Sequence, residues 1–244
     1  MMYVIVGGSA GVGRALAASF ASAGHDLILV SSDERDLRAM TADLVIRYGV
    51  RVCPLAADVN DGDSYLDRLA STAQAMGGMD GLLFPVGAVA ATDDCSLDPA
   101  RVTWLIRVNY EAIVRAVTRF LPDLMTRPAA TLVAFGSVAA VRGRRRNVSY
   151  SAAKRALQSF FESLRHVCVG SNVRVQFYVL GYMDTTLAGG LRTRIPKGDP
   201  EVLSVRVLRN LGRDVGVVYY PSFWRPAAFA LRHTPWWIFK RMSF

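Results

Sequence analysis

Cysteine is scarce in this chain, and the three cysteines present are far apart in the sequence. Cys53, Cys95 and Cys168 form no Cys-x-x-Cys pair and show no His/Cys ligand spacing. An odd number of scattered thiols indicates neither a disulfide framework nor a zinc site. We therefore expect reduced cysteines, a cytoplasmic protein and no bound metal.

The sequence also lacks the features that divide or target a chain. It has no linker rich in Pro, Gly or Ser, no repeat and no low-complexity tract. Its apolar first twelve residues have no basic segment and lead into a glycine-rich loop, which predicts a strand and not a signal peptide. With 244 residues, 52% of them hydrophobic, the chain can bury one large core. We expect one domain.

Acidic side chains are few, since 20 Asp and Glu stand against 29 Lys and Arg, for a formal net charge of +9. Residues 190–244 hold ten of the basic residues and only three acidic ones, Asp199, Glu201 and Asp214. A basic face can bind nucleic acid, but no nucleic-acid motif accompanies this one, and we expect no such partner. A phosphorylated substrate or an anionic lipid surface explains the charge equally well.

A loop with four glycines, residues 7–13, stands between a β-branched run at residues 3–6 and a helix-like segment at residues 14–20. Glycines let a backbone approach a pyrophosphate closely, and the N-terminus of a helix offers free amides and a positive dipole end. The alternative is a tight turn without a ligand. The strand, loop and helix together favour a dinucleotide site.

The rest of the chain alternates between apolar runs and helix-like segments. This alternation predicts a doubly wound parallel sheet with helices on both faces, that is, an α/β fold. We expect strands at residues 25–30, 50–55, 81–84, 131–135 and 173–179, and helices at residues 34–48, 64–76, 101–121 and 149–167.

The end of the second expected strand bears on the choice of nicotinamide cofactor. An acidic residue there favours the free ribose 2′-hydroxyl of NAD, whereas hydroxyls or cations accommodate the 2′-phosphate of NADP. Ser31 and Ser32 occupy this place with Arg35 and Arg38 nearby, while Asp33 comes one or two positions late. The pattern favours NADP(H) and leaves NAD(H) open.

Tyr150 and Lys154 are four residues apart in an expected helix and therefore lie on the same face. A cation beside a phenol favours the phenolate and moves its pKa toward the range useful for general acid–base chemistry. By itself this spacing is common among ordinary surface helices. Ser137 strengthens it, because it follows a strand at the edge where parallel sheets bind ligands, although a plain turn would also explain a serine there.

Taken together, these residues resemble the short-chain dehydrogenase/reductase family, in its short single-domain branch. Residues 6–13 match the TGxxxGxG loop of that branch except for Val6, and the resemblance extends over about residues 3–190. It implies a Rossmann-type fold and a catalytic tetrad of Asn109, Ser137, Tyr150 and Lys154. It also implies a cofactor site formed by Gly7, Ser9, Ala10, Gly11, Val12, Gly13, Ser31, Ser32, Asp58, Val59, Gly87, Tyr150, Lys154, Gly181 and Thr185.

Asp58 has two interpretations from the sequence, as the cap of a turn or as the acid that holds the adenine amino group. Three positions depart from the family pattern. Val6 replaces a threonine, residues 84–87 stand where NNAG is common, and Leu180 replaces the proline before Gly181. None of these changes removes a catalytic group.

The resemblance implies an NADP(H)-dependent oxidoreductase that reduces a ketone or oxidises a secondary alcohol. Tyr150 would transfer the proton, Ser137 would hold the carbonyl oxygen, and Lys154 would lower the phenol pKa and bind the nicotinamide ribose. Asn109 would keep the helix open for a water that relays protons. The alternative is a catalytically silent NAD(P)-sensing protein, which the intact tetrad disfavours. Such enzymes are commonly homodimers or homotetramers.

Two segments are expected to shape substrate use. We place a substrate lid at about residues 186–212, inside a catalytic domain of residues 1–220. Residues 221–244 form an extension of bulky aromatics and cations that is too short to span a bilayer. This extension suits either contact with the inner face of a membrane, with a lipid-linked or other lipophilic carbonyl substrate, or closure of a subunit interface or of the substrate pocket.

Overall fold

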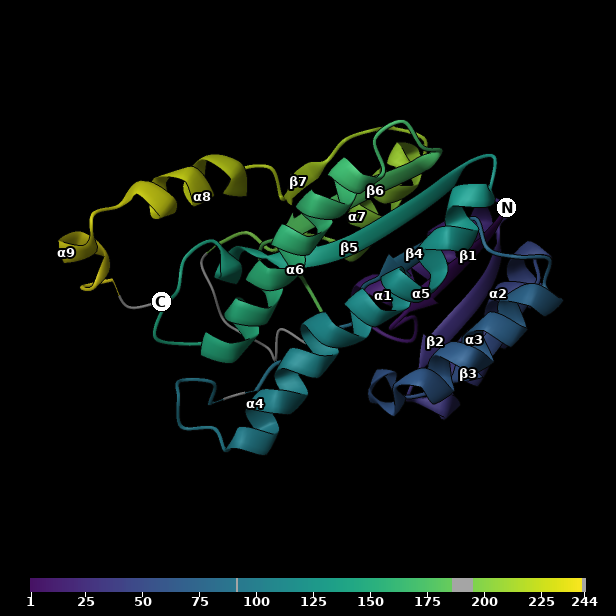
Figure 1. The fold of residues 1–244 in the computed structure, drawn as a ribbon, viewed down its shortest axis with the longest axis horizontal. Helices are drawn as coiled ribbons and strands as arrows, with labels where there is room; N and C mark the ends of the chain where they lie inside the picture. Colours follow the sequence, from purple (N-terminus) through teal and green to yellow (C-terminus); the bar gives the residue numbers. More distant parts are fainter. Residues whose placement is uncertain (91, 186–194, 243–244) are drawn as a thin grey trace.

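The computed structural model describes residues 1–90, 92–185 and 195–242 (Figure 1). Its centre is a parallel sheet of seven strands in the order β3-β2-β1-β4-β5-β6-β7. The order reverses between β1 and β4, so the sheet is doubly wound, as the sequence predicts. The strands are β1 Met2–Val6, β2 Asp26–Ser31, β3 Val52–Ala56, β4 Gly81–Phe84, β5 Ala130–Ser137, β6 Val173–Leu180 and β7 Val217–Tyr220.

Helices cover both faces of this sheet and bury two separate cores. Leu157 of α6 and Phe120 of α5 belong to one core, while Phe20 of α1 and Leu203 of α7 belong to the other. The helices are α1 Gly11–Ser22, α2 Glu34–Tyr48, α3 Asp63–Ala75, α4 Pro99–Ile106, α5 Ala112–Thr126, α6 Val148–Val167, α7 Pro200–Asn210, α8 Trp224–His233 and α9 Trp236–Phe239. Two 3-10 turns, η1 Val59–Asp61 and η3 Val138–Ala140, follow β3 and β5.

The helix expected at residues 101–121 is interrupted. A π-helical stretch, η2 Arg107–Glu111, separates α4 from α5 and contains Asn109. The Asn109 Nδ2 donates to the carbonyl of Leu105, 2.9 Å away, one turn earlier. Because the side chain takes this carbonyl, the local hydrogen-bond pattern widens, as is frequent at functional sites.

The region after β6 differs in part from the expected lid. Residues 186–194 of the predicted lid lie outside the described residues, but α7 is a packed helix and not a mobile segment. Leu203 and Val207 of α7 are fully buried, and the Ser204 Oγ lies 2.6 Å from the Ser19 Oγ of α1. The strand β7, which the sequence analysis missed, pairs in parallel with β6 and completes the sheet.

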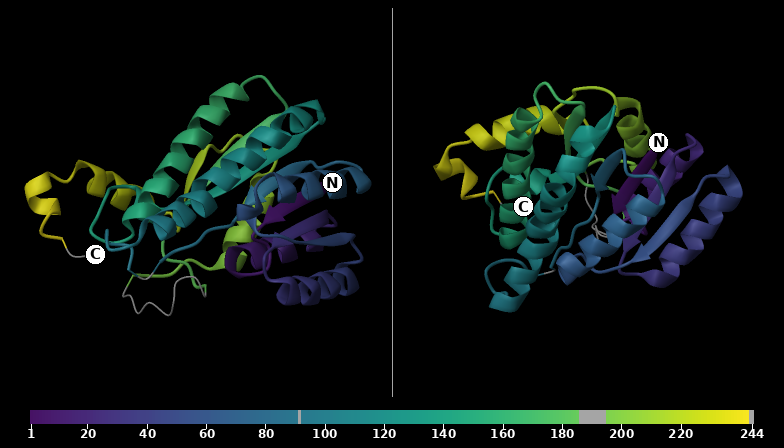
Figure 2. Two further views of the ribbon diagram at one scale, coloured as in Figure 1. Left: turned by 60° about the horizontal axis from the view of Figure 1, so that its bottom comes forward. Right: turned by 45° about the vertical axis from the view of Figure 1, so that its right-hand side comes forward.

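Beyond β7, the helices α8 and α9 extend outward from the edge of the domain (Figure 1; Figure 2, left). Trp224 and Phe239 are buried, whereas most other side chains of this extension face solvent. Within residues 1–90, 92–185 and 195–242, no helix has both the length and the apolar character needed to cross a membrane.

Candidate active site and cofactor cradle

The turn from β1 into α1 has no room for a side chain at Gly7 or Gly13. Gly7 has a φ of +92°, and a Cβ there would lie 2.8 Å from the Val86 backbone. A Cβ on Gly13 would lie 1.9 Å from the Gly7 carbonyl oxygen, so any other residue at this position would force the backbone to shift. Because Gly7 and Gly13 have no side chains, the start of α1 packs directly against the backbone of the loop.

The N-terminus of α1 is left open to a ligand. Its N-cap is Ala10, which forms no side-chain cap, and its first turn contains no acidic residue. The first amides of a helix need a partner, and an anion supplies one. A Cβ on Gly11 would lie 3.1 Å from the Cγ2 of Thr185, so the structure brings Thr185 to this loop, while Val12 packs against the core below. These features fit a dinucleotide pyrophosphate.

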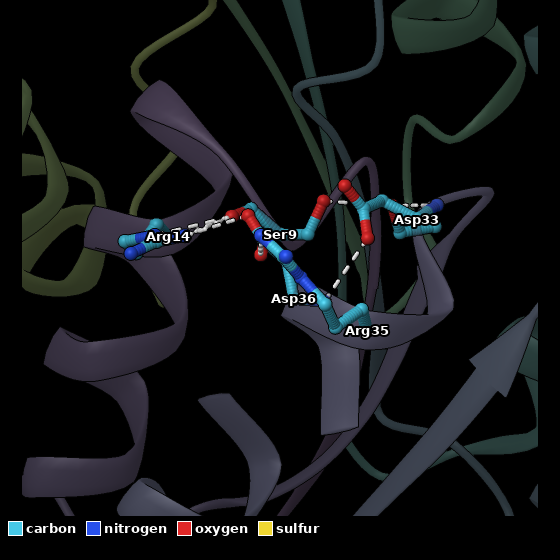
Figure 3. A network of polar contacts seen from close by, with 6 residues as sticks. Ser9, Arg14, Asp33, Arg35 and Asp36 are labelled. Atoms are coloured by element: carbon cyan, nitrogen blue, oxygen red, sulfur yellow. Dashed lines mark hydrogen bonds and ion pairs between the residues drawn. The ribbon is translucent and has the colours of Figure 1, made fainter. Parts of the chain in front are cut away.

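Ser9 and Ser31 meet at the end of β2, where the sequence places the ribose site. Figure 3 shows Ser9 with Arg14, Arg35 and Asp36 nearby. Their Oγ atoms are 2.7 Å apart. The Arg14 guanidinium donates to the Ser9 carbonyl through Nε at 3.1 Å and Nη2 at 2.9 Å, and its side chain is 57% exposed. Arg35 is also exposed and pairs with Asp36 over 3.6 Å. Ser32 follows at the same edge, so hydroxyls and cations lie at this position. The carboxylates of Asp33 and Asp36 lie there too, and Asp36 also pairs with Arg14 at 3.5 Å.

Asp58 is seen here as the cap of a turn. Its Oδ1 accepts hydrogen bonds from the backbone N of Asn60 at 2.9 Å and from the Asn60 Nδ2 at 2.8 Å. Val59 begins the 3-10 turn and packs against the first core. Of the two interpretations drawn from the sequence, the structure shows this one, while contact with adenine stays a prediction.

Lys154, Asn109 and Gly87 come together behind the expected nicotinamide site. A Cβ on Gly87 would lie 3.2 Å from the Asn109 Oδ1 and 3.4 Å from the Lys154 Nζ. Asn109 is fully buried, and its amide bonds both the N and the O of Ala88, at 3.1 and 2.8 Å. The Lys154 Nζ donates to the Phe135 carbonyl at 3.1 Å. Burial lowers the pKa of Lys154 from 10.5 to about 8.

The side chains of Ser137 and Tyr150 are joined by a hydrogen bond. Burial raises the pKa of the Tyr150 phenol, while a side-chain hydrogen bond with Ser137 and the charge of Arg144 act in the opposite direction. The sequence analysis expected Lys154 to lower this pKa. In the structure the Lys154 Nζ donates to the Phe135 carbonyl, and its effect on the phenol stays a prediction.

Asp93 is a residue that the sequence analysis missed. Its side chain is buried, with 3% of the residue exposed, and it accepts from the backbone N of Ser149 at 2.9 Å and from that of Tyr150 at 2.8 Å. A carboxylate at a helix N-terminus satisfies free amides and interacts favourably with the dipole. Asp93 thereby fixes the first turn of α6, which carries Tyr150. It lies more than fifty residues earlier in the chain, so no local pattern could reveal it.

Comparison with protein families decides the identity. The model described as short chain dehydrogenase matches residues 2–195. The chain is a short-chain dehydrogenase/reductase. The family consists of NAD(P)-dependent oxidoreductases, so the chain is an enzyme of this class, and its sheet and helices are those of the Rossmann-type fold.

Relatives of this short-chain dehydrogenase/reductase span most of its length. An uncharacterized oxidoreductase of Mycobacterium tuberculosis is 27% identical over 239 residues, which cover 98% of this chain and 96% of that protein. An uncharacterized oxidoreductase of Myxococcus xanthus is 30% identical over a stretch that covers 75% of this chain and 72% of that protein. A hydroxysteroid 11-beta-dehydrogenase 1-like protein of Xenopus tropicalis is 27% identical over a stretch that covers 96% of this chain and 85% of that protein.

Solved structures show the same fold. A short-chain dehydrogenase of Sphingobium yanoikuyae in complex with NADPH superimposes with a TM-score of 0.83 and 22% identity, over 99% of this chain and 96% of that one. A 3-oxoacyl-[acyl-carrier protein] reductase of Brucella melitensis gives a TM-score of 0.80 at 18% identity, over 90% and 89%. Identities this low support the fold alone.

Proposed function

We propose that this enzyme is an NADP(H)-dependent carbonyl reductase in which Tyr150 is the general acid. The observation that carries the proposal is the Tyr150–Ser137 pair at the carboxyl end of β5, with Lys154 and Asn109 packed beside Gly87. In an open parallel sheet, ligands bind outside this edge. The glycine cradle at the start of α1 lies at the same edge of the sheet.

Each side chain has a defined task. The nicotinamide ring, when bound, supplies a hydride to the carbonyl carbon. Ser137 donates a hydrogen bond to the carbonyl oxygen, and Tyr150 gives that oxygen its proton as negative charge develops. Lys154 binds the ribose hydroxyls, and Asn109 holds the π-helical turn open for a water that returns a proton toward Lys154.

The protonation state of Tyr150 suits its use as a general acid. Because burial raises this pKa, the phenol keeps its proton at neutral pH. A protonated phenol is ready to act as an acid, which suits reduction. Oxidation of the alcohol needs the phenolate, so its rate should increase as the pH rises.

The preference for NADP(H) rests on the end of β2. Ser9, Ser31 and Ser32 offer hydroxyls there, and the Arg14 and Arg35 side chains are 57% and 94% exposed. A 2′-phosphate carries negative charge and many acceptor oxygens, so this set suits it. An acidic side chain at position 31 would favour NAD instead.

The proposal extends to the surroundings of the enzyme. The substrate is a small or lipid-linked carbonyl compound, and the enzyme is a cytoplasmic homodimer or homotetramer. The extension at residues 221–244 places it at the inner face of the membrane.

The first test is titration of the purified protein with NADPH and with NADH, followed by nicotinamide fluorescence. We expect NADPH to bind more tightly, and Arg14→Ala to reduce that preference, with Arg47→Ala on α2 as the matched control. Equal or tighter binding of NADH would overturn the cofactor assignment. Failure of both cofactors to bind would overturn the proposed function.

A further inference from the structure

The C-terminal extension is attached to the loop that follows the catalytic serine. The Arg142 Nη1, five residues after Ser137, donates to the Leu231 carbonyl at 3.0 Å and to the carbonyl of Thr234. The Arg142 guanidinium also lies 4.0 Å from the ring centre of Phe239, which is 6% exposed. One arginine therefore holds both α8 and α9 against the post-β5 loop.

A second attachment lies at the end of β6. A Cβ on Gly181 would lie 1.9 Å from the indole Nε1 of Trp224, so the indole packs directly on this glycine. Trp224 also meets Tyr182 edge-on, with ring centres 5.9 Å apart. The extension thus bridges the loops after β5 and after β6, which border the edge where the substrate binds.

The exposed residues of the extension combine aromatic rings with positive charge. Phe229 is 68% exposed, Trp236 66% and Trp237 60%. No acidic residue occurs from position 215 to the end of the sequence. The cations there are Arg225, Arg232, Lys240 and Arg241, each with an exposed side chain, and Ile238 and Met242 add exposed apolar surface.

We propose that residues 221–242 are a membrane-contact surface that brings the substrate opening of the enzyme to an anionic lipid bilayer. Indole rings partition into the headgroup region, and cations beside them are attracted to anionic lipid. Because the two attachments hold this surface to loops of the active site, a bilayer bound to it lies next to the opening. That this opening admits a substrate rests on the proposed reductase function. A lipophilic carbonyl compound is the substrate class that suits an opening next to a bilayer.

Charge argues against a second copy of the chain as the occupant. A twofold contact would place the same patch on both sides of the interface. Four cations of one copy would then face four of the other without an acidic residue between them. An anionic bilayer instead complements the charge and accepts the exposed rings.

The test is flotation of the full-length protein with vesicles of phosphatidylglycerol and phosphatidylcholine in equal amounts, compared with phosphatidylcholine alone. We expect flotation with the anionic vesicles only. The double variant Lys240→Glu/Arg241→Glu should weaken binding by at least about fivefold for each cation removed. Trp236→Ala/Trp237→Ala should also release the protein, whereas Ile46→Ala on α2 and Arg209→Glu on α7 should not.

Placement of the opening is tested with bound NADPH as a donor of fluorescence energy and a headgroup-labelled lipid as the acceptor. We expect quenching of nicotinamide emission by labelled anionic vesicles, and weaker quenching in Arg142→Ala, which removes one of the two attachments of the extension. Flotation without energy transfer would overturn the placement, because the site would face away from the lipid.

The outcomes separate this inference from the proposed function. Equal flotation of every variant, or none for the native protein, would overturn the membrane surface even if NADPH binds. A dimer that the tryptophan variants dissociate in sedimentation, without flotation, would show that the surface joins two copies. Flotation without NADPH binding would instead overturn the reductase and leave the lipid contact standing.

Discussion

The N-termini of α1 and α6 serve opposite purposes in this enzyme. The first turn of α1 has no side-chain cap and contains Gly13, where an added Cβ would lie 1.9 Å from the Gly7 carbonyl oxygen. The first turn of α6 is capped by the buried carboxylate of Asp93, which takes the amides of Ser149 and Tyr150. A helix that binds a ligand keeps its amides free, whereas a helix that positions a catalytic group has them occupied.

The largest effect is expected for a substitution on α6 that removes the proposed acid and leaves the proposed cofactor site at α1 unchanged. Tyr150→Phe on α6 should lower kcat by about a thousandfold, since general acid catalysis typically contributes 10²–10⁴-fold, and should leave the Kd for NADPH nearly unchanged. Steady-state kinetics and fluorescence titration measure the two quantities. Tyr219→Phe on β7 is the control. Retained turnover in Tyr150→Phe would mean that α6 does not carry the acid.

The second prediction compares the pH dependence of stability that a buried cation and an exposed cation contribute. Lys154 of α6 is 4% exposed and its pKa falls to about 8, whereas the Arg14 side chain of α1 is 57% exposed. Between pH 8 and 10.5 the unfolded chain binds more protons at this lysine than the native chain does. Its contribution to the free energy of unfolding should therefore rise with pH over this window, by about 3 kcal/mol in all.

Lys154→Met should lack this rise. Urea unfolding at several pH values, compared with native protein and with the exposed control Lys240→Met, measures it. Parallel stability curves for the native protein and Lys154→Met would show that the lysine is not effectively buried.

The third prediction concerns the glycine-rich turn at the start of α1. Gly13→Ala forces its Cβ onto the Gly7 carbonyl, so the loop must shift, and misplacement on the ångström scale can cost about 100-fold in affinity for NADPH. Gly212→Ala, where nothing lies within 4 Å of the added Cβ, is the matched control. An unchanged Kd in Gly13→Ala would show that the cradle does not hold the cofactor.

The smallest effect is expected for the cap of α6. Asp93→Ala should lower stability by about 1 kcal/mol, a typical cost of losing an N-cap, and lower kcat by about tenfold because Tyr150 loses its fixed position. Asp98→Ala removes the N-cap of α4, where the Asp98 Oδ1 accepts from the backbone N of Arg101 at 2.9 Å. It should cost similar stability with kcat unchanged. Equal loss of kcat in both would make Asp93 a stability residue only.

Much of the site could be predicted because its signals are local. The glycine spacing, the Tyr150–Lys154 repeat and Ser137 at a strand end each depend on neighbours within a few residues. The expected lid differs at residues 200–210, which form the helix α7 packed against α1. Strand β7 was missed because four residues give little periodicity to detect.

The sequence by itself determined the doubly wound sheet, the glycine cradle and the order of Asn109, Ser137, Tyr150 and Lys154, because backbone geometry and periodicity encode them. Only the tertiary structure decided which distant groups act on them. Asp93 reaches α6 over more than fifty residues, and Arg142 reaches the C-terminal extension over about ninety. Contacts of this kind depend on how loops meet in space, and no local pattern in the chain records them.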